Sequence, residues 1–232
     1  MTTKTKKPKA IILMTPPGTA VFPYLNQTDR GKYAKDKVNG DWKTGLRLPL
    51  ADPEVKTFIA SLEAAYAANL ARAEAEETPK EKAEREAQNK PLGATRPYKN
   101  EFADDGSPTG FVQVSFKRRG GGQDPKDPTR TWLNVIGLFD SKNKPIDRSK
   151  TRIGGGSRII VAYEVNPFQT DIGAGISLQL HAVQVLERAD APTKDAAQYG
   201  FQQQEDGFVD DSGDSPMTAE SVATSGDDGN DV

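Results

Sequence analysis

The chain has 232 residues, a length that suits one domain with or without terminal extensions. Hydrophobic residues make up 35% of it, which is low for a fully globular chain, so we expect part of the chain to remain unpacked. Cysteine is absent, which excludes disulfides, cysteine-ligated zinc and a cysteine nucleophile. Neither an apolar run of about 18 residues nor a signal-peptide pattern occurs, so the sequence predicts a cytoplasmic protein with no membrane partner.

The net charge of −2 conceals two oppositely charged parts. Residues 189–232 hold one basic and 11 acidic residues, a net charge of −10, whereas residues 1–188 carry a net charge of +8. A basic body with an acidic end is typical of proteins that bind nucleic acid or recruit partners through a tail. Because residues 189–232 contain few large apolar side chains, we expect a disordered acidic tail there. The lysine-rich residues 1–9 are expected to form a flexible basic arm.

The first half of the chain predicts strands followed by a helix. Residues 10–51 are broken by proline and glycine turns and contain alternating apolar positions typical of half-buried strands. Asp52 is a good N-cap and Pro53 suits the first helical position. Apolar residues then follow at spacings of three and four, which predicts one inserted helix over about 53–75. We expect a solvated charged extension from there to residue 90.

After residue 90, four segments rich in β-branched and aromatic residues predict four more strands. These segments are Gly110–Lys117, Thr131–Phe139, Arg158–Val165 and Ile176–Leu186. The glycine- and proline-rich residues 120–128 between the first two are expected to form a mobile loop. Short strands, an inserted helix and one basic face together predict an all-β fold over residues 10–188, namely an OB-fold built as a five-stranded Greek-key barrel.

Alternation along the strands separates an apolar face from a face that carries cations and aromatic rings. The predicted inward residues are Trp42, Leu46, Leu48, Leu50, Val112, Val114, Phe116, Leu133, Val135, Phe139, Ile159, Val161, Tyr163, Val165, Ile176, Leu178 and Leu180. The predicted phosphate contacts on the outward face are Lys43, Arg47, Lys117, Arg118, Arg119, Arg130 and Arg158. Phe111 and Trp132 are the predicted stacking platforms on that face.

Cations interleaved with exposed rings suit a single strand of nucleic acid, because cations release phosphate counterions and each stacked base contributes about 1–3 kcal/mol. The alternative for each ring is an ordinary core position, which is the more frequent role of a strand aromatic. The single histidine, His181, is expected to be a strand residue without a functional role.

Three stretches in the same order resemble a known family. They are Asp52-Pro53 with the helix ending in Glu63–Ala68, then Lys90-Pro91-Leu92 through Pro97-Tyr98 running into the strand Phe111–Phe116, and then Ile153-Gly154-Gly155-Gly156-Ser157-Arg158 continuing to Leu180. The chain resembles the T7-like bacteriophage single-stranded DNA-binding proteins over nearly its whole length. The resemblance implies a non-enzymatic OB-fold protein that coats single-stranded DNA in phage replication, recombination and repair, in the cytoplasm of the infected bacterial host. It also implies that Phe168 stacks on a base.

In that family the acidic tail contacts the phage DNA polymerase and the primase-helicase, supports a homodimer and competes with DNA for the basic groove. The resemblance implies the same partners here. The tail residues assigned to this role are Asp210, Asp211, Asp214, Asp227, Asp228 and Asp231.

Three alternatives stay open. An RNA-binding OB-fold protein would use the same stacking, because discrimination depends on the 2′-OH. A replication hub would recruit partners through the tail and bind DNA only incidentally. A metal-dependent nuclease would use carboxylates such as Glu101, Asp104, Asp105 and Asp140. These carboxylates occur in turn contexts, where Asp is expected for conformational reasons, so we predict no enzyme, no metal and no cofactor.

Overall fold

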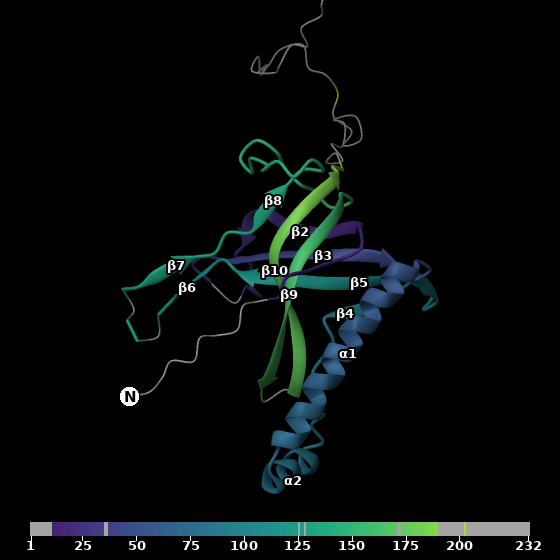
Figure 1. Ribbon diagram of the computed structural model, residues 1–232, viewed down its shortest axis with the longest axis vertical. Helices are drawn as coiled ribbons and strands as arrows, with labels where there is room; N and C mark the ends of the chain where they lie inside the picture. Colours follow the sequence, from purple (N-terminus) through teal and green to yellow (C-terminus); the bar gives the residue numbers. More distant parts are fainter. Residues whose placement is uncertain are drawn as a thin grey trace, which may run out of the picture. The chain divides into compact units, whose positions relative to one another are not determined.

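The computed structural model describes residues 11–34, 37–124, 126–127, 129–170, 173–189 and 202, and all but Gln202 belong to one compact unit, Met1–Ala191. The elements in chain order are β1 (Leu13–Met14), β2 (Gly18–Asp29), β3 (Asp41–Pro49), α1 (Pro53–Glu76), α2 (Pro79–Ala87), β4 (Tyr98–Phe102), β5 (Pro108–Arg119), β6 (Gly121–Gln123), β7 (Thr131–Leu133), β8 (Gly137–Phe139), β9 (Arg158–Thr170) and β10 (Gly173–Glu187) (Figure 1).

Five long strands close into a ring. β9 pairs with β2, β2 with β3, β3 with β5, β5 with β10, and β10 returns to β9. All of these pairings are antiparallel except that of β5 with β10, which is parallel at Lys117 and Gln179. Because each of the five strands has a neighbour on both sides, the ring encloses a barrel whose inward side chains form the core. β1, β4 and β8 extend the sheet outside this ring.

The barrel core confirms most of the predicted inward residues. Val112, Val114 and Phe116 on β5 are buried, as are their counterparts on β3, β9 and β10. Tyr163 stands edge-on to Phe58 of α1 and to Phe116, with ring centroids 5.9 and 5.4 Å apart. Leu50, Phe139 and Val165 are only partly buried.

The predicted inward positions of Leu133 and Val135 are wrong, because these residues are 74% and 65% exposed. The predicted strand Thr131–Phe139 is two strands, β7 and β8, and β7 pairs only with β6 in a separate two-stranded ribbon. This ribbon projects away from the barrel (Figure 1) and has no core beneath it. Because Gly121–Gln123 pair with β7, the predicted mobile loop over residues 120–128 contains a strand, β6.

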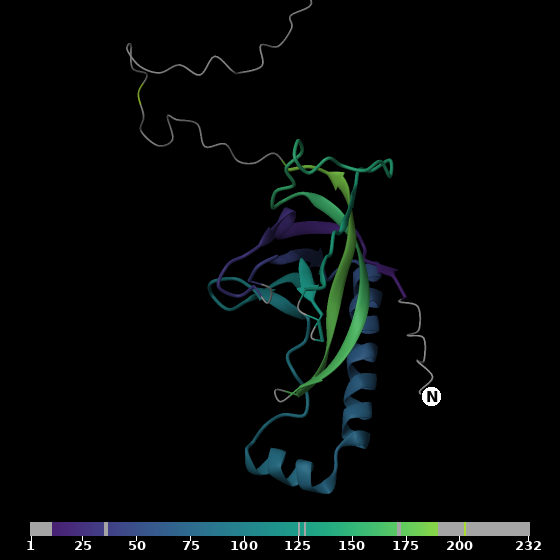
Figure 2. The same ribbon diagram turned by 90° about the vertical axis from the view of Figure 1, so that its left-hand side faces the viewer.

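α1 forms as the sequence predicts and covers one end of the barrel. Asp52 accepts a hydrogen bond from the Glu54 amide through Oδ1 (2.8 Å) and caps the helix. The buried side of α1 carries Val55, Phe58, Leu62, Tyr66, Asn69 and Ala73. The β9–β10 hairpin runs alongside α1 in both Figure 1 and Figure 2.

The prediction of a single inserted helix is wrong, because the charged residues after α1 form a second helix, α2. Thr78 and Glu81 make a reciprocal capping box, and Pro79 occupies the first turn, where its missing N–H costs nothing. Arg85 of α2 binds Glu77 with two hydrogen bonds of 2.7 and 3.1 Å. A charge run without an apolar stripe can therefore still be helical when its caps and ion pairs are satisfied.

Candidate nucleic-acid interface

A groove lies at the base of the β6–β7 ribbon and gathers four of the predicted site residues. Its volume is about 330 Å³. Its lining residues are Lys117, Arg118, Arg119, Gly121, Trp132, Asn134, Asn166, Ser177 and Gln179. The ribbon is held in place by hydrogen bonds from Trp42 Nε1 to the Asn134 carbonyl (2.7 Å) and from Asn134 Nδ2 to the Arg119 carbonyl (3.0 Å).

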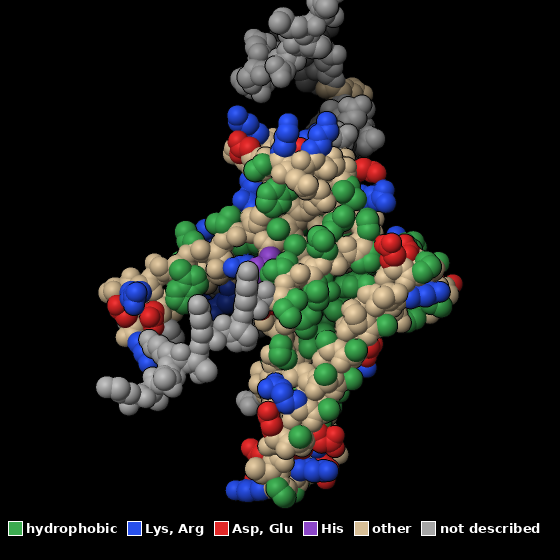
Figure 3. Space-filling view, in the orientation of Figure 1, with side chains coloured by type: hydrophobic (Ala, Val, Ile, Leu, Met, Phe, Trp, Pro, Cys, Tyr) green, Lys and Arg blue, Asp and Glu red, His purple; other side chains and the backbone are tan. Residues whose placement is uncertain are grey.

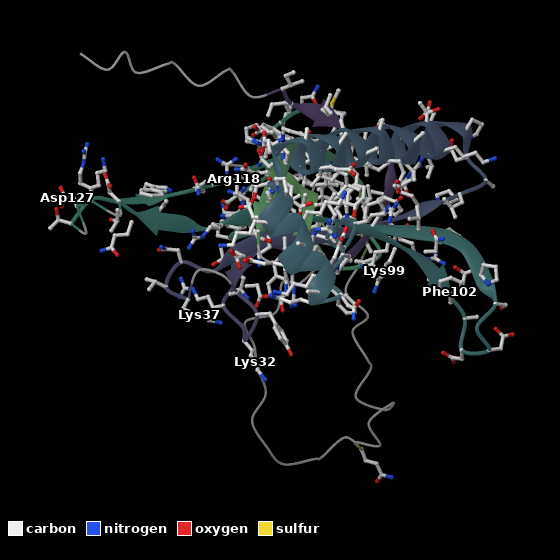
Figure 4. All side chains as sticks on the ribbon, turned by 90° about the horizontal axis from the view of Figure 1, so that it is seen from below. Lys32, Lys37, Lys99, Phe102, Arg118 and Asp127 are labelled. Atoms are coloured by element: carbon white, nitrogen blue, oxygen red, sulfur yellow. The ribbon has the colours of Figure 1, made fainter. Side chains whose placement is uncertain are left out.

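The cations of the groove gather where β5 leaves the barrel and enters the ribbon. Figure 3 shows Lys and Arg side chains in the hollow between ribbon and barrel, and Figure 4 places Arg118 at the base of the ribbon, with Asp127 at its far end. Arg119 is exposed and Arg118 is partly buried. The Nε–H of Arg118 is buried and has no hydrogen-bond partner among the described residues.

Trp132 presents an open aromatic surface to the groove. It is 48% exposed, whereas the other tryptophan, Trp42, is 8% exposed and belongs to the core. The Trp132 ring rests on Gly122, where any Cβ would overlap it. The glycine therefore lets the ring lie against the ribbon backbone while its other surface stays accessible.

His181 connects Arg118 to a carboxylate. Its Nδ1 lies 3.0 Å from Nη1 of Arg118, and its Nε2 lies 3.1 Å from Oε2 of Glu164. Since the guanidinium can only donate, Nδ1 accepts, and this bonding pattern assigns the imidazole proton to Nε2, which donates to Glu164. The expectation that His181 has no role missed this contact. The sequence did contain a sign of this contact. The alternation that places Leu178 and Leu180 inward directs residue 181 outward, toward the face that carries Arg118.

Several predicted phosphate contacts already have carboxylate partners. Lys43 lies 2.5 Å from Asp29, Arg47 lies 2.6 Å from Glu101, Lys117 lies 2.9 Å from the fully buried Asp41, and Arg158 lies 3.2 Å from Glu187. The hydrogen bond from Lys43 is the main cause that lowers the pKa of Asp29, and the hydrogen bond from Arg47 does the same for the pKa of Glu101. A phosphate at these cations must compete with a carboxylate.

The remaining predicted site residues lie apart from the groove or are covered. Phe111 lies beneath Arg47, whose guanidinium carbon is 3.4 Å from the ring centroid. Arg130 is exposed on the ribbon, and Arg158 pairs with Glu187 at the opposite end of β9 from Asn166. Phe168 is half-buried.

Phe168 lies on the same face of the β9–β10 hairpin as the groove. Its cross-strand partner is Gly175, and the next pair on that face is Asn166 with Ser177, both of which line the groove. A Cβ on Gly175 would lie 2.9 Å from the Phe168 ring, so the ring packs on the hairpin backbone. Asn69 of α1 fixes this part of the hairpin by donating to the carbonyls of Phe168 (3.0 Å) and Gly175 (2.8 Å).

The described part of the chain contains no group of three or more His, Asp or Glu side chains arranged to hold a metal ion. Glu101, one of the carboxylates of the nuclease alternative, is instead bound to Arg47. None of the helices within the described ranges is long and apolar enough to cross a membrane. The predicted basic arm and the tail carboxylates from Asp210 to Asp231 lie outside the described residues.

The fold and the groove define a closed five-stranded β-barrel protein with a cationic groove beside an exposed tryptophan. The family model described as "Single-stranded DNA-binding protein, Bacteriophage T7" matches residues 18–188. The single-stranded DNA-binding proteins of Enterobacteria phage T3 and Escherichia phage T7 are each 32% identical to this chain over 183 residues, which is 74% of this chain and 74% of each relative. The chain belongs to the bacteriophage T7 single-stranded DNA-binding protein family.

A solved structure agrees with this assignment. The crystal structure of gp2.5, a single-stranded DNA-binding protein encoded by bacteriophage T7, is similar with a TM-score of 0.61 and 25% sequence identity. The match covers 87% of this chain and 100% of that one. The family expected from the three sequence stretches is thereby confirmed.

Proposed function

We propose that this protein binds single-stranded DNA without sequence preference in the groove at the base of the β6–β7 ribbon. The observation that carries the proposal is the half-exposed ring of Trp132 beside Arg118 and Arg119. A base stacks on the ring and the flanking phosphates bind the guanidinium groups. Stacking needs only the π-face that every base has, so this arrangement is tolerant of sequence. The relatives from phages T3 and T7 are named single-stranded DNA-binding proteins, which supports single-stranded DNA as the ligand here.

We propose the OB-fold as the architecture of this barrel. The ring order β9–β2–β3–β5–β10, with only the β5–β10 pairing parallel, supports a five-stranded Greek-key barrel. In this proposal residues 10–188 form the OB-fold domain, residues 1–9 a basic arm and residues 189–232 an acidic tail. The outer face of the barrel with Lys43, Arg47, Phe111 and Arg158, together with Arg130 on the ribbon and Phe168 on the β9–β10 hairpin, is proposed to extend the DNA path. Phosphates would displace the carboxylates now paired with Lys43, Arg47 and Arg158.

The tail is proposed to act as a tethered competitor for the cationic groove. A net charge of −10 attached to a body of +8 gives a high effective concentration of carboxylates at that body. The same segment is proposed to recruit the phage DNA polymerase and primase-helicase and to support a homodimer, in the cytoplasm of the infected host during replication, recombination and repair. The chain is proposed to have no catalytic activity.

The test is a titration with oligo-dT, followed by intrinsic tryptophan fluorescence at several salt concentrations, for the full chain and for residues 1–188. We expect quenching, a steep salt dependence and tighter binding by the truncated form. Replacing both Arg118 and Arg119 with Gln should reduce the slope of log K against log salt by about 1.4, because each phosphate contact on a single strand contributes about 0.7.

The matched control replaces two exposed lysines of α2, Lys80 and Lys82, with Gln, and should leave the slope unchanged. Absence of binding by both the full chain and residues 1–188 would contradict the proposal and favour the interaction-hub alternative. Tighter binding of rU than dT oligomers of equal length would favour the RNA alternative.

A further inference from the structure

A second cationic cavity lies between β2 and the loop that precedes β9. It has a volume of about 670 Å³. Its lining includes Phe22 and Tyr24 from β2, and Arg148, Lys150 and Arg152 from the loop. No Asp or Glu is present among the described residues that line it, and neither Lys150 nor Arg152 forms an ion pair with a described carboxylate. The cavity therefore offers uncompensated positive charge, unlike Lys43, Arg47 and Lys117 on the outer face of the barrel.

Phe22 lies at this cavity in a strained backbone conformation. It is 80% exposed and has a φ angle of +46°, which places a non-glycine residue in the left-handed region. The strand register breaks between Val21 and Tyr24, so Phe22 lies in an irregular segment of β2. Such a conformation is unfavourable for a residue with a side chain, and a ring that remains in solvent gains no burial to offset the strain. Strain of this kind that is retained at an exposed ring points to a ligand that covers the ring.

The wall opposite Phe22 is held rigidly. Asn26 Nδ2 donates to the carbonyls of Arg148 (3.0 Å) and Thr151 (2.5 Å), and Asn26 Oδ1 accepts from the Ile153 amide (2.8 Å). Arg148 itself donates to the Leu25 carbonyl (3.1 Å) and lies over the ring of Trp42, 5.2 Å from its centroid. Arg148 is thus occupied by contacts within the protein, whereas Lys150 and Arg152 are exposed on the same loop.

The cavity connects to the groove through a row of side chains across three strands. Tyr24 lines the cavity, and its register partner on β3 is Lys43, whose Nζ lies 4.7 Å from the Tyr24 ring centroid. Lys43 is in turn the register partner of Lys117, which lines the groove. Neighbouring strands lie about 4.8 Å apart, so the row from Tyr24 to Lys117 spans about 10 Å. A single flexible strand can follow this row from one site to the other.

We propose that this cavity is a second contact point for the same single strand of nucleic acid, with a base stacked on Phe22 and phosphates bound by Lys150 and Arg152. Free phosphate would use the two cations but would leave the strained ring uncovered, so a nucleotide segment fits the site better. The inference rests on the proposed function of the groove and adds a length requirement to it. Only an oligonucleotide long enough to leave the groove reaches Phe22.

The test measures the affinity of the full chain for oligo-dT of about 4 to 16 nucleotides, the range of site sizes of a single OB-fold. Phe22→Gly removes the ring and suits the positive φ, so the fold is preserved. We expect it to bind the shortest oligomers as the unmodified protein does and to lose at least threefold in affinity for the longest. Replacing Lys150 and Arg152 with Gln should lower the salt slope by about 1.4 for long oligomers only.

Two matched controls accompany these variants. Phe102→Ala removes a ring that is 60% exposed on β4, on the opposite side of the molecule from Asp127 in Figure 4, and Lys80→Gln with Lys82→Gln removes two charges from α2. Both should match the unmodified protein at every length. Equal affinities of Phe22→Gly and the unmodified protein for all lengths would overturn the second contact point while leaving the groove intact. Failure of the unmodified protein to bind any oligomer would instead overturn the proposed function.

Discussion

The guanidinium of Arg118 donates to Nδ1 of His181 across 3.0 Å, and His181 in turn contacts Glu164 through Nε2. These two contacts hold the Arg118 side chain in position in the groove. His181→Leu removes the acceptor and should weaken oligo-dT binding about three- to tenfold while lowering the salt slope by about 0.7, the value of one phosphate contact. His181→Gln keeps one acceptor and one donor and should bind nearly as well as the unmodified protein.

The same pair gives a coupling measurement. If His181 acts by positioning Arg118, then His181→Leu has no further effect on affinity when Arg118 is already Gln. Salt titrations of the four proteins of this cycle provide the readout, because a change in overall stability alone would leave the salt slope unaltered. An unchanged slope in the His181→Leu single variant would contradict the positioning role.

The tryptophan of the ribbon should account for the fluorescence response to DNA. Trp132→Ala should reduce affinity for oligo-dT about five- to 150-fold, the equivalent of about 1–3 kcal/mol per stacked base, and should abolish the quenching. The melting temperature should change by less than about 2 °C, because the ribbon lies outside the barrel core. Phe102→Ala, an exposed ring on β4 outside the groove, is the control and should retain the quenching. Quenching that survives in Trp132→Ala would show that another ring carries the stacking.

Gly122 offers an independent probe of the same ring. A Cβ at this position overlaps Trp132, so Gly122→Ala must displace the ring from the ribbon backbone. We expect a shifted tryptophan emission spectrum in the free protein and a weaker response to oligo-dT. Gly154→Ala serves as a control for substitution of an unhindered glycine, since its φ lies outside the left-handed region and the nearest atom to its Cβ position, the Ala189 carbonyl oxygen, is 3.9 Å away. An emission spectrum identical to that of the unmodified protein would mean that the ring accommodates the methyl group in place.

Phe168 should affect stability as well as binding. Its ring is half-buried against Gly175, so Phe168→Ala should cost roughly 2 kcal/mol, about half the cost of truncating a fully buried phenylalanine. This corresponds to a decrease of roughly 4–8 °C in the melting temperature. Phe168→Leu retains most of the packing and should restore stability without restoring DNA affinity. Full affinity in Phe168→Leu would remove Phe168 from the stacking residues.

Asn69 should control the order of the hairpin tip. Asn69→Leu leaves the carbonyls of Phe168 and Gly175 without their donors and should destabilise the protein by about 2–4 kcal/mol. Hydrogen exchange should accelerate first in the distal half of β9 and β10, because α1 no longer holds it. Asn100→Leu on exposed β4 is the control. Uniform acceleration over the whole barrel would contradict a local role.

The Glu77–Arg85 pair predicts a pH-dependent stability of the corner between α1 and α2. The hydrogen bond from Arg85 lowers the pKa of Glu77 below its ordinary value of 4.5, so the folded state releases this proton more readily than the unfolded state. The stabilisation is therefore complete above pH 4.5 and is lost as the pH falls through the lower folded-state pKa. Melting curves of the unmodified protein and Glu77→Gln should differ most near pH 7 and should converge as the pH falls below the folded-state pKa of Glu77. A difference that stays constant as the pH falls below 4.5 would contradict this role of the Glu77–Arg85 pair.

Local patterns in the sequence predicted the barrel core and α1 correctly, because alternation along β5 and the Asp52–Pro53 cap depend on neighbouring residues. The capping box of Thr78 and Glu81 was equally local, but the absence of an apolar stripe obscured α2. The exposure of Leu133 could not be predicted in this way, since alternation does not reveal that β7 leaves the barrel.

The sequence predicted the accessibility of a site residue only where that residue has no ion-pair partner from a distant part of the chain. Trp132 is exposed as expected, but Lys117 meets Asp41 and Arg47 meets Glu101 across many intervening residues. Such pairings are set by strand register, which the sequence pattern does not specify. The exposure of Phe22 likewise depends on a break in register between β2 and β3.

The parallel pairing of β5 with β10 has a consequence for synthesis of the chain. The ring cannot close until β10 exists, yet β3 and β5 emerge much earlier, before β9 and β10 can complete the core around them. At about 5–20 residues per second, the interval between completion of β5 and of β10 is on the order of several seconds. The barrel of the nascent protein must therefore remain open during that time, and it closes only when β10 pairs with β5.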